Sequence, residues 1–340
     1  MESSGKDKSR LTGLDALRGI AILLVVICHY LHDRILGGIA NVIVGPFGLG
    51  GVTLFFLLSG FLIERHLARD GNLIRYFSRR LFRILPAYFI CLAVILAVNV
   101  FTHESRSWTP REIAINALLV QDVLGAPLML GVIWTLLVEV KFYALAPFVK
   151  RAGPLALLLA PYLTIALNGA VFAARGEASN FLTYVTFCFL GMQFGPWSRG
   201  ELPSYALAAV TALAAAATYI FGTDYALGLT IFVIVNAAIL AAALKRPIAV
   251  PVLPFFGNVS YSWYLYHAAV GYPLIAAVTA MTGSPLIAVT LSAIAGLFAA
   301  WTSYVVIERP GIALGLRCET FLRLPPPRVG ASVKREQQTV

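Results

Sequence analysis

The chain has few charged residues and almost no cysteine. Charged side chains make up 12% of its 340 residues, whereas hydrophobic residues make up 59%. The charged share is about half that of an average soluble domain, so water is not the solvent for most of the chain. Its four cysteines stand singly and lack the spacing of a disulfide framework or a metal site, so neither is expected.

Long polar stretches and internal repeats are also missing. Up to Pro310 no segment is long enough for an extramembrane domain, and we find no repeat of hydropathy halves of the kind that marks many secondary transporters. The first apolar block contains Asp15, Arg18 and His29 and has no small-residue cleavage site after it. We therefore expect a retained helix rather than a signal peptide, and a bundle of membrane helices that carries the function.

The apolar residues occur in blocks of about 18 to 22, the length that crosses a hydrocarbon core of about 30 Å as a helix. This pattern predicts an all-α, polytopic membrane bundle of about ten helices, and 111–133 could contain a further re-entrant segment. The predicted spans are 14–32, 48–66, 84–102, 130–149, 153–173, 181–198, 203–221, 224–243, 254–276 and 285–307.

The net charge of +10 indicates a membrane topology rather than a nucleic-acid partner. With the N-terminus inside, 21 of the 26 Lys and Arg residues fall on the inner face of ten spans, four fall outside, and Lys141 lies within a span. The positive-inside rule predicts such a split. Both termini are therefore expected to be cytoplasmic.

Three segments follow from this topology. Residues 1–13 form a cytoplasmic N-terminal segment, 14–310 the transmembrane domain, and 311–340 a basic tail that we expect to be disordered near the inner leaflet. The longest external segment, about 103–129, could form a binding surface or a lid.

Arg18 and His29 are ionisable residues inside the first predicted span. A charge at mid-bilayer costs several kcal/mol, so it usually faces a cavity or a partner. Eleven residues of helix place the two within about 20° of one face and about 16 Å apart along the axis. Asp15, one turn before Arg18, could pair with it. Arg18 could be an interfacial anchor and His29 an interhelical hydrogen-bonding group, but together they favour a polar track in which an imidazole can take a proton from a hydroxyl.

Arg80 and Arg83 lie one turn apart at the cytoplasmic start of the third predicted span. The planar fork of arginine suits phosphate better than lysine does, so both are candidates for binding a phosphate-bearing donor. The alternative is a topology anchor. We expect only that anchoring role for their basic neighbours Arg65, Arg69, Arg75 and Arg79.

Five further polar residues lie within the predicted spans, and four of them leave alternatives open. Glu139 and Lys141 are spaced to point to different sides of a helix, and Glu139 could pair with an arginine of the bundle or act in catalysis. Ser59 is expected to allow close helix packing rather than to act as a nucleophile. Tyr264 and His267, one turn apart, could line an acceptor route or belong to an interfacial aromatic belt.

Six motifs follow one another along the chain. They are Leu14 to Gly19, with Arg18 and His29 as an Arg-x10-His pair; Gly51 to Leu62; Arg80 to Arg83, followed by Ile84 to Tyr88; Trp134 to Glu139 with Phe142-Tyr143; Ser260 to His267; and Glu308 to Pro310. In this order they resemble the motifs of the acyltransferase 3 family of membrane O-acyltransferases, which includes O-antigen and nodulation-factor acetylases. Thr135 stands where the family more commonly has serine.

The resemblance implies transfer of an acyl group, acetyl by default, from acyl-CoA to a hydroxyl of a carbohydrate such as a surface or exported polysaccharide. It implies a bacterial inner membrane, with acyl-CoA as a donor substrate and no permanently bound cofactor or metal. By their match to the motifs, Arg18 would help to hold the donor and His29 would be the catalytic base. The full set of candidates is His29, Arg18 and Glu139 for catalysis, Arg18, Arg80 and Arg83 for the donor, and Trp134, Tyr264 and His267 for the substrate.

Several alternatives to this hypothesis remain. A covalent acyl-His29 relay is the second mechanism. A transporter of a lipid-linked sugar or organic anion, an acyltransferase for a non-carbohydrate hydroxyl, and a membrane sensor or assembly protein are the other functions. Many family members carry a C-terminal esterase-like domain outside the membrane. This chain is expected to work among membrane lipids as a bundle alone, as a homo-oligomer or with a separate extramembrane partner.

Overall fold

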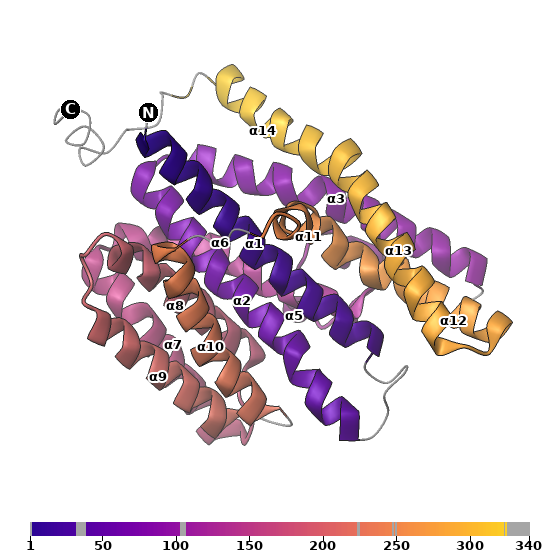
Figure 1. Cartoon of the computed structure of the whole chain (residues 1–340), viewed down its shortest axis with the longest axis horizontal. Helices are drawn as coiled ribbons and strands as arrows, with labels where there is room; N and C mark the ends of the chain where they lie inside the picture. The colour runs from indigo at the N-terminus through magenta and orange to yellow at the C-terminus, as the bar shows by residue number, and fades with distance from the viewer. Residues whose placement is uncertain are drawn as a thin grey trace. The chain divides into compact units, whose positions relative to one another are not determined.

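The structure, a computed structural model, describes residues 2–31, 39–102, 107–222, 225–246, 248, 250–322 and 324. These residues form helices and loops without a strand, which confirms the predicted all-α class (Figure 1). The helices are α1 Glu2–Leu31, α2 Ile39–Arg69, α3 Leu73–Thr102, α4 Pro110–Ala117, α5 Gln121–Leu124, α6 Trp134–Arg151, α7 Pro154–Arg175, α8 Asn180–Ser198, α9 Ser204–Phe221, α10 Ala226–Lys245, α11 Leu253–Ala269, α12 Gly271–Thr282, α13 Pro285–Ser303 and α14 Arg309–Phe321. A 3-10 turn, Gly131–Ile133, precedes α6, and a π-helical turn, Tyr304–Glu308, joins α13 to α14.

Within the described residues, eight helices are long and apolar enough to cross a membrane, or nine if the bent pair α11 and α12 is one span. These nine correspond to nine of the ten predicted spans. The remaining one, 181–198, is α8, a helix of 19 residues. Its asparagine, glutamine and threonines lower its hydropathy, so it is not among the eight. The chain is a multi-pass membrane protein.

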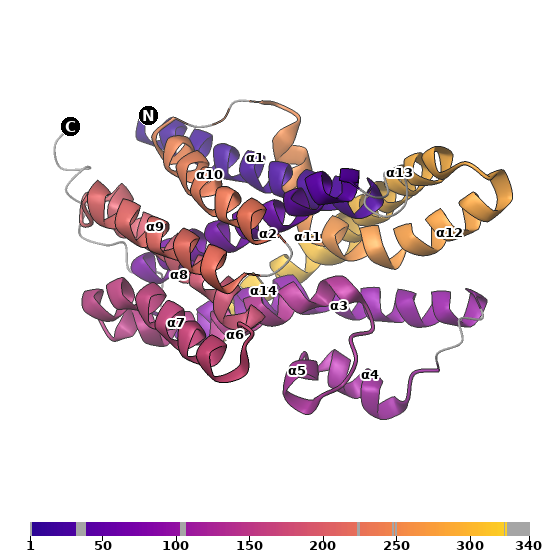
Figure 2. The same ribbon diagram turned by 90° about the horizontal axis from the view of Figure 1, so that it is seen from below.

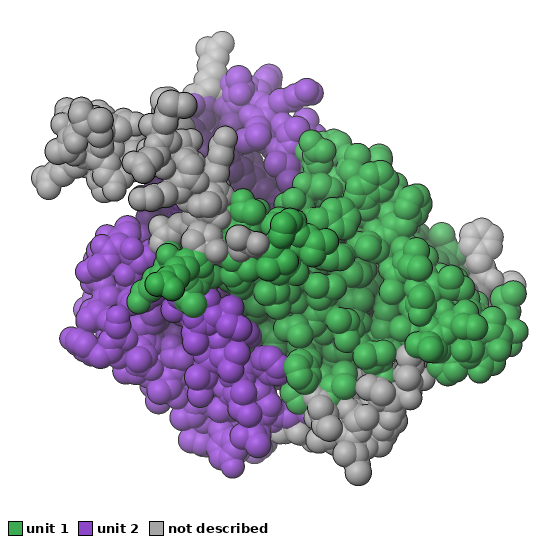
Figure 3. All heavy atoms as spheres, viewed as in Figure 1, with its two compact units in different colours: residues 1–54, 84–138, 242–310 green, residues 55–83, 139–241, 311–340 purple. Residues whose placement is uncertain are grey.

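The chain divides into two compact units, which Figure 3 colours separately. Unit 1 comprises residues 1–54, 84–138 and 242–310, and unit 2 comprises 55–83, 139–241 and 311–340. The boundaries fall inside the helices α2, α3, α6, α10 and α14. Three of the six sequence motifs therefore lie wholly within one unit, and three are divided between the units.

In unit 1, α11 packs against α1 and α13, and α12 packs against α13. Figures 1 and 2 both show α12 and α13 side by side. The chain bends by 44° between α11 and α12. Pro273 explains the bend, because it has no N–H to donate to the carbonyl of Ala269 one turn earlier. Large apolar side chains on the outside of α13, such as Leu291 and Phe298, are exposed, as expected for a lipid-facing surface.

A second proline interrupts the regular helix after α13. Pro310 has no N–H, and the preceding turn, Tyr304–Glu308, takes the wider π form. The chain then continues as α14 to Phe321. Residues 311–321 are thus helical rather than disordered, because the apolar part of the tail can pack as a helix. Residues 325–340, the rest of the expected tail, lie outside the described residues.

The segment before α6 contains two short helices beside α3 (Figure 2). Thr109 and Glu112 form a capping box at the start of α4, with Pro110 in its first turn. The buried Asn116 ties the segment together, since its amide donates to the Pro127 carbonyl at 3.0 Å and Tyr88 donates to its backbone carbonyl at 2.7 Å. Part of the segment expected to be an external surface is therefore fixed to α3.

In unit 2, α8 packs against α7 and α9. All side chains from Tyr184 to Gly195 are buried. The polar ones have partners: the Thr186 hydroxyl donates to Thr164 at 2.8 Å, and the Gln193 amide donates to the Leu157 carbonyl at 2.6 Å. A helix enclosed by protein in this way tolerates polar residues that a lipid-facing helix does not.

Candidate active site

His29 and His267 are hydrogen bonded to each other in unit 1. Nδ1 of His29 lies 2.8 Å from Nε2 of His267, although the two residues are 238 positions apart in the chain. The rings are parallel within 2°, with their centres 5.0 Å apart. His267 is fully buried and His29 is half-buried. The structure thus brings the predicted base against one of the predicted substrate-binding residues.

The buried histidine is held by its own helix and by α1. Nδ1 of His267 lies 3.1 Å from the carbonyl oxygen of Trp263, one turn earlier in α11. The Tyr30 hydroxyl donates to the backbone carbonyl of His267 at 2.8 Å. The ring of Tyr272 stands edge-on to both histidines, with centre distances of 6.4 Å and 6.2 Å. Two successive residues of α1, His29 and Tyr30, thus form hydrogen bonds with His267 of α11.

Glycines bring α1 and α11 together at their other end. A Cβ on Gly19 would lie 2.2 Å from the carbonyl oxygen of Leu253, and one on Gly257 would lie 1.9 Å from that of Asp15. Only glycine allows such an approach, and small residues of this kind commonly set the contact between membrane helices. The backbone contact limits how the two histidine-bearing helices can slide past each other.

Arg18 lies on α1, as predicted, on the same continuous helix as His29. Its Nη1 is 3.9 Å from Oδ1 of Asp15, and the two side chains are 16% and 36% exposed. The pairing expected from their spacing is confirmed, at the long end of the range for an ion pair. This half-exposed pair contrasts with the dry environment of His267.

The motif that begins at Trp134 contacts the same part of unit 1 through the side chain of Thr135. Trp134 begins α6, and the hydroxyl of the following Thr135 lies 2.6 Å from that of Tyr264, where either can donate. Tyr264 is also within 2.8 Å of the Val132 carbonyl, and its ring centre is 5.7 Å from that of His267. Two predicted substrate-binding residues, Tyr264 and His267, therefore adjoin each other as their spacing predicted.

The last two motifs meet through a buried carboxylate. The Ser262 hydroxyl donates to Oε2 of Glu308 at 3.0 Å, and both side chains are buried. Glu308 closes the π-helical turn, so the bond ties this irregular backbone to α11. Sequence reasoning did not assign Glu308 a partner, because nothing in a linear motif indicates which serine lies opposite it.

In unit 2, Glu139 accepts hydrogen bonds from two hydroxyls. Ser59 donates to its Oε1 at 3.2 Å, and Tyr143 donates to the same oxygen. The Ser59 hydroxyl oxygen also lies 3.3 Å from the Tyr143 hydroxyl oxygen. The ammonium of Lys141 stands 5.2 Å from the ring centre of Phe181, which confirms that Glu139 and Lys141 point to different sides of α6.

The same cluster gives Ser59 a hydrogen-bonding role that was not expected and adds a cation. The neighbouring Gly60 provides a close approach to α8, because a Cβ there would lie 1.9 Å from the Cys188 carbonyl oxygen. The Arg80 guanidinium stands 5.2 Å from the centre of the Tyr143 ring, within the range of a cation–π interaction. Tyr143 belongs to one of the six motifs but was not among the candidate site residues, although its position four residues after Glu139 was a usable signal.

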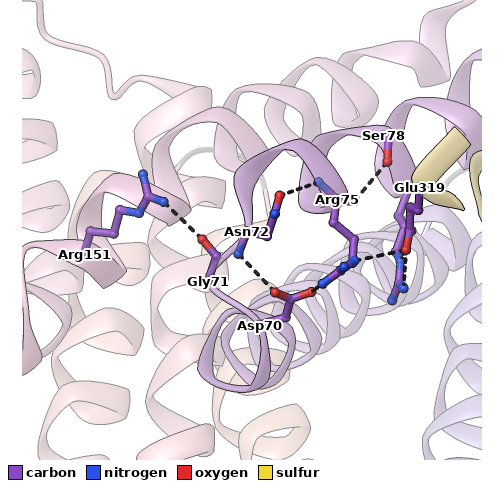
Figure 4. A network of polar contacts seen from close by, with 8 residues as sticks. Asp70, Gly71, Asn72, Arg75, Ser78, Arg151 and Glu319 are labelled. Carbon is purple, nitrogen blue, oxygen red and sulfur yellow. Dashed lines mark hydrogen bonds and ion pairs between the residues drawn. The ribbon is translucent and has the colours of Figure 1, made fainter. Parts of the chain in front are cut away.

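Arg75 and Arg79 do more than anchor the start of α3. Figure 4 shows the Arg75 side chain between the carboxylates of Asp70 and Glu319, and its Nε lies 3.0 Å from Glu319. Arg79 donates to the same glutamate at 2.9 Å. Burial opposes the ionisation of Asp70, but hydrogen bonds from Arg75 and from the Asn72 amide outweigh it and lower the pKa of this carboxyl. Arg83, on the same helix, is half-buried.

Glu64 is a second buried charge of unit 2 and was not among the candidate site residues. Its side chain is fully buried, and it accepts hydrogen bonds from Lys150 at 2.6 Å and from Arg199 at 2.8 Å. Arg199 also donates to Glu201 at 2.9 Å, which lowers the pKa of that exposed carboxyl. A Cβ on Gly195 would lie 1.7 Å from Glu64, so only glycine leaves room for the carboxylate. Lys150 and Arg199, which the positive-inside rule assigns to the inner face, therefore also form ion pairs with a buried acid.

Comparison with known proteins supports the resemblance seen in the motifs. The chain is 26% identical to the putative membrane-bound transacylase BcsY of Komagataeibacter xylinus, over 92% of this chain and 86% of that protein. It is 28% identical to the putative peptidoglycan O-acetyltransferase YrhL of Bacillus subtilis and 25% identical to the O-acetyltransferase OatA of Staphylococcus aureus. These matches cover 90% and 92% of this chain but only 56% and 59% of the two relatives. No solved structure matches the chain.

The family model described as an acyltransferase domain matches residues 11–306, nearly the whole chain. This range includes the histidine pair of unit 1 and the Ser59, Glu139 and Tyr143 cluster of unit 2. The chain therefore belongs to the acyltransferase 3 family and is a membrane acyltransferase.

Proposed function

We propose that the protein transfers an acyl group, acetyl by default, from acyl-CoA to a hydroxyl of a carbohydrate. The observation that carries this proposal is the half-buried His29, hydrogen bonded through one ring nitrogen to a buried His267. An imidazole oriented by a second group is the usual arrangement of a general base that activates a hydroxyl. The similarity to YrhL, a putative peptidoglycan O-acetyltransferase, supports a carbohydrate acceptor.

In the proposed reaction, the acceptor oxygen attacks the thioester carbonyl carbon while its proton passes to His29. The tetrahedral intermediate then collapses, the carbon–sulfur bond breaks, and the thiolate of CoA leaves with the proton from His29. The products are the O-acyl ester and CoA, and His29 returns to its neutral form. A relay through acyl-His29 is the alternative route.

The donor phosphates require cations. We propose Arg18, Arg80 and Arg83 for this task. Arg75 and Arg79 suit it less well, because Asp70 and Glu319 already accept their hydrogen bonds. Arg80 presents its guanidinium over an aromatic ring rather than to a carboxylate, which leaves its charge less compensated.

A direct assay tests the proposal. The purified full chain in lipid nanodiscs is given radiolabelled acetyl-CoA and either a polysaccharide, a lipid-linked oligosaccharide or a small-molecule alcohol. We expect CoA release and labelled ester with a carbohydrate acceptor, and loss of both in His29→Ala. Equal rates in the wild type and His29→Ala would contradict the role of His29. Transfer to the small alcohol alone would contradict the carbohydrate acceptor.

We further propose ten spans with both termini on the cytoplasmic side of the bacterial inner membrane. Residues 15 and 29 of α1 lie opposite residues 257 and 267 of α11, so these two helices run in the same direction. Because each crossing reverses the direction of the chain, an odd number of crossings must separate them. The helices α2, α3, α6, α7, α9 and α10 are only six, and α8 supplies the seventh.

The topology can be tested at the two ends of α8. If α8 crosses the membrane, Glu177→Cys and Glu201→Cys, each placed in a chain whose own cysteines are replaced, react with an impermeant maleimide from opposite sides. We expect Glu201→Cys to be labelled only after the cytoplasmic side is opened. Labelling of both positions from the same side would rule out the ten-span arrangement.

A further inference from the structure

His267 has no ring nitrogen left for a substrate. Its Nδ1 lies 3.1 Å from the Trp263 carbonyl oxygen, its Nε2 lies 2.8 Å from Nδ1 of His29, and its side chain is fully buried. A residue that receives an acceptor sugar needs a donor or acceptor that faces the sugar. The surroundings of His267 are instead those of a group that acts on its neighbour.

The protons of the histidine pair follow from these contacts. A carbonyl oxygen only accepts, so Nδ1 of His267 carries a proton that it donates to Trp263. Full burial disfavours a charged ring, so His267 is neutral and its Nε2 holds a lone pair. That lone pair accepts the hydrogen bond from His29, so Nδ1 of His29 carries a proton.

We propose that His267 is a positioning residue that holds neutral His29 in its Nδ1–H tautomer, with the lone pair on Nε2. This inference rests on the proposed function, because it assigns the basic nitrogen of the same reaction. The tautomer of a histidine is set by the hydrogen bond that its other nitrogen makes. Here the chain of donors runs from His29 through His267 to the backbone of α11.

The geometry suits this role. Parallel rings with centres 5.0 Å apart and nitrogens 2.8 Å apart meet edge to edge, so the hydrogen bond lies in the plane of both rings, where the lone pair is. When Nε2 of His29 takes the acceptor proton, Nδ1–H remains directed at His267, and the bond becomes charge-assisted. His267 thus stabilises the cation without itself bringing a charge into the bundle.

The backbone of His267 is also held in place. The Tyr30 hydroxyl donates to its carbonyl at 2.8 Å, and a Cβ on Gly271 would lie 2.1 Å from that hydroxyl. Tyr30 and His29 are adjacent in α1, so α1 contacts His267 at both its side chain and its carbonyl. This double attachment limits movement of the acceptor nitrogen relative to His29.

The test compares two replacements of His267 with one spectroscopic and one kinetic readout. The side-chain oxygen of His267→Gln can accept the His29 bond, whereas His267→Leu has no acceptor. The full chain, labelled with 15N-histidine in nanodiscs, reports which nitrogen of His29 carries the proton, and His29→Ala assigns its signals. We expect the Nδ1–H tautomer in the wild type and His267→Gln, and a mixture in His267→Leu.

In the kinetic readout, we expect His267→Leu to lower kcat by about 100-fold or more with little change in the KM for acetyl-CoA, and His267→Gln to recover most of that loss. An Nε2–H tautomer in the wild type would overturn the proposal, and this measurement needs no replacement of His267, only His29→Ala for the assignment. Equal tautomers and equal kcat in His267→Leu and the wild type would overturn it as well. A wild type with the Nδ1–H tautomer but no acyl transfer would support the positioning role and refute the proposed function.

Discussion

Unit 1 and unit 2 place polar groups inside a membrane protein in different ways. Around His267 in unit 1, the partners are imidazole, hydroxyl and carbonyl groups, which can be neutral. In unit 2, the buried Glu64 and Arg75 are charged and paired with two partners each. A network of neutral groups can transfer a proton while any charge that forms stays hydrogen bonded. A network of ion pairs instead holds the helices that carry its members in fixed positions. We therefore expect changes in the histidine network of unit 1 to affect chemistry and changes in the paired charges around Glu64 and Arg75 in unit 2 to affect stability.

The largest expected effect is on catalysis in unit 1. His29→Gln keeps a polar side chain of similar length but has no basic nitrogen, so we expect acyl transfer to fall by about 1,000-fold or more. Thermal unfolding in detergent should shift little, because the glutamine amide can still donate to His267. Activity within about tenfold of the wild type would contradict the distinction between the histidine network and the paired charges.

The buried acid of unit 2 should give the opposite result. Glu64→Ala leaves Lys150 and Arg199 without their shared carboxylate, and we expect the free energy of unfolding to drop by about 2–4 kcal/mol. Residual folded protein should keep its kcat. The control is Glu201→Ala, which removes a partner of Arg199 that is 56% exposed and should cost at most about 1 kcal/mol. Denaturant titration measures both, and equal losses would show that burial of Glu64 is not the cause.

The crossing of α1 and α11 tests whether unit 1 also depends on packing. Gly257→Ala places a methyl group where a Cβ would be 1.9 Å from the Asp15 carbonyl oxygen, so the helices must separate. We expect a loss of about 1–3 kcal/mol in stability and a fall in kcat. Gly131→Ala is the matched control, since nothing lies within 4 Å of a Cβ there. An unchanged kcat in Gly257→Ala would mean that the helix spacing does not affect the histidine pair.

The smallest effect concerns the pH dependence of unit 2. The pKa of Asp70 is lowered by its hydrogen bonds, so its contribution to stability is present above the pKa of the unfolded chain and is lost as the pH falls through the folded value. Asp70→Asn should lower stability by about 1–2 kcal/mol at neutral pH, and the difference from the wild type should shrink in acid. Unfolding curves between neutral pH and acid measure this, and a constant difference would exclude Asp70 as the titrating group.

Much of the fold could be predicted because helix formation and membrane insertion depend on local composition. The apolar blocks located nine spans, and the spacing of Asp15 and Arg18 predicted their pairing. The π-helical turn before Pro310 and the helix beyond Gly311 were not anticipated. The reason is that a proline predicts an interruption, but packing decides whether the chain stops or continues after it.

The site was only partly predictable. His29 was selected from its place in an apolar span, and Glu139 and Arg80 from their charge, but their contacts were not foreseen. Glu139 meets hydroxyls rather than the arginine considered for it, and Ser59 is one of its donors. Each contact joins residues from separate helices, and helical periodicity gives the face of one helix without the identity of its neighbour.

The amino-acid sequence by itself determined that this is an all-α membrane protein with the motifs of an acyltransferase, because hydropathy and spacing act over one or two turns. Only the tertiary structure decided which polar groups meet. His29 and His267 are 238 positions apart, and they are brought within 2.8 Å by a helix crossing that depends on two glycines. The tertiary contact, not the identity of either histidine alone, sets where their protons lie.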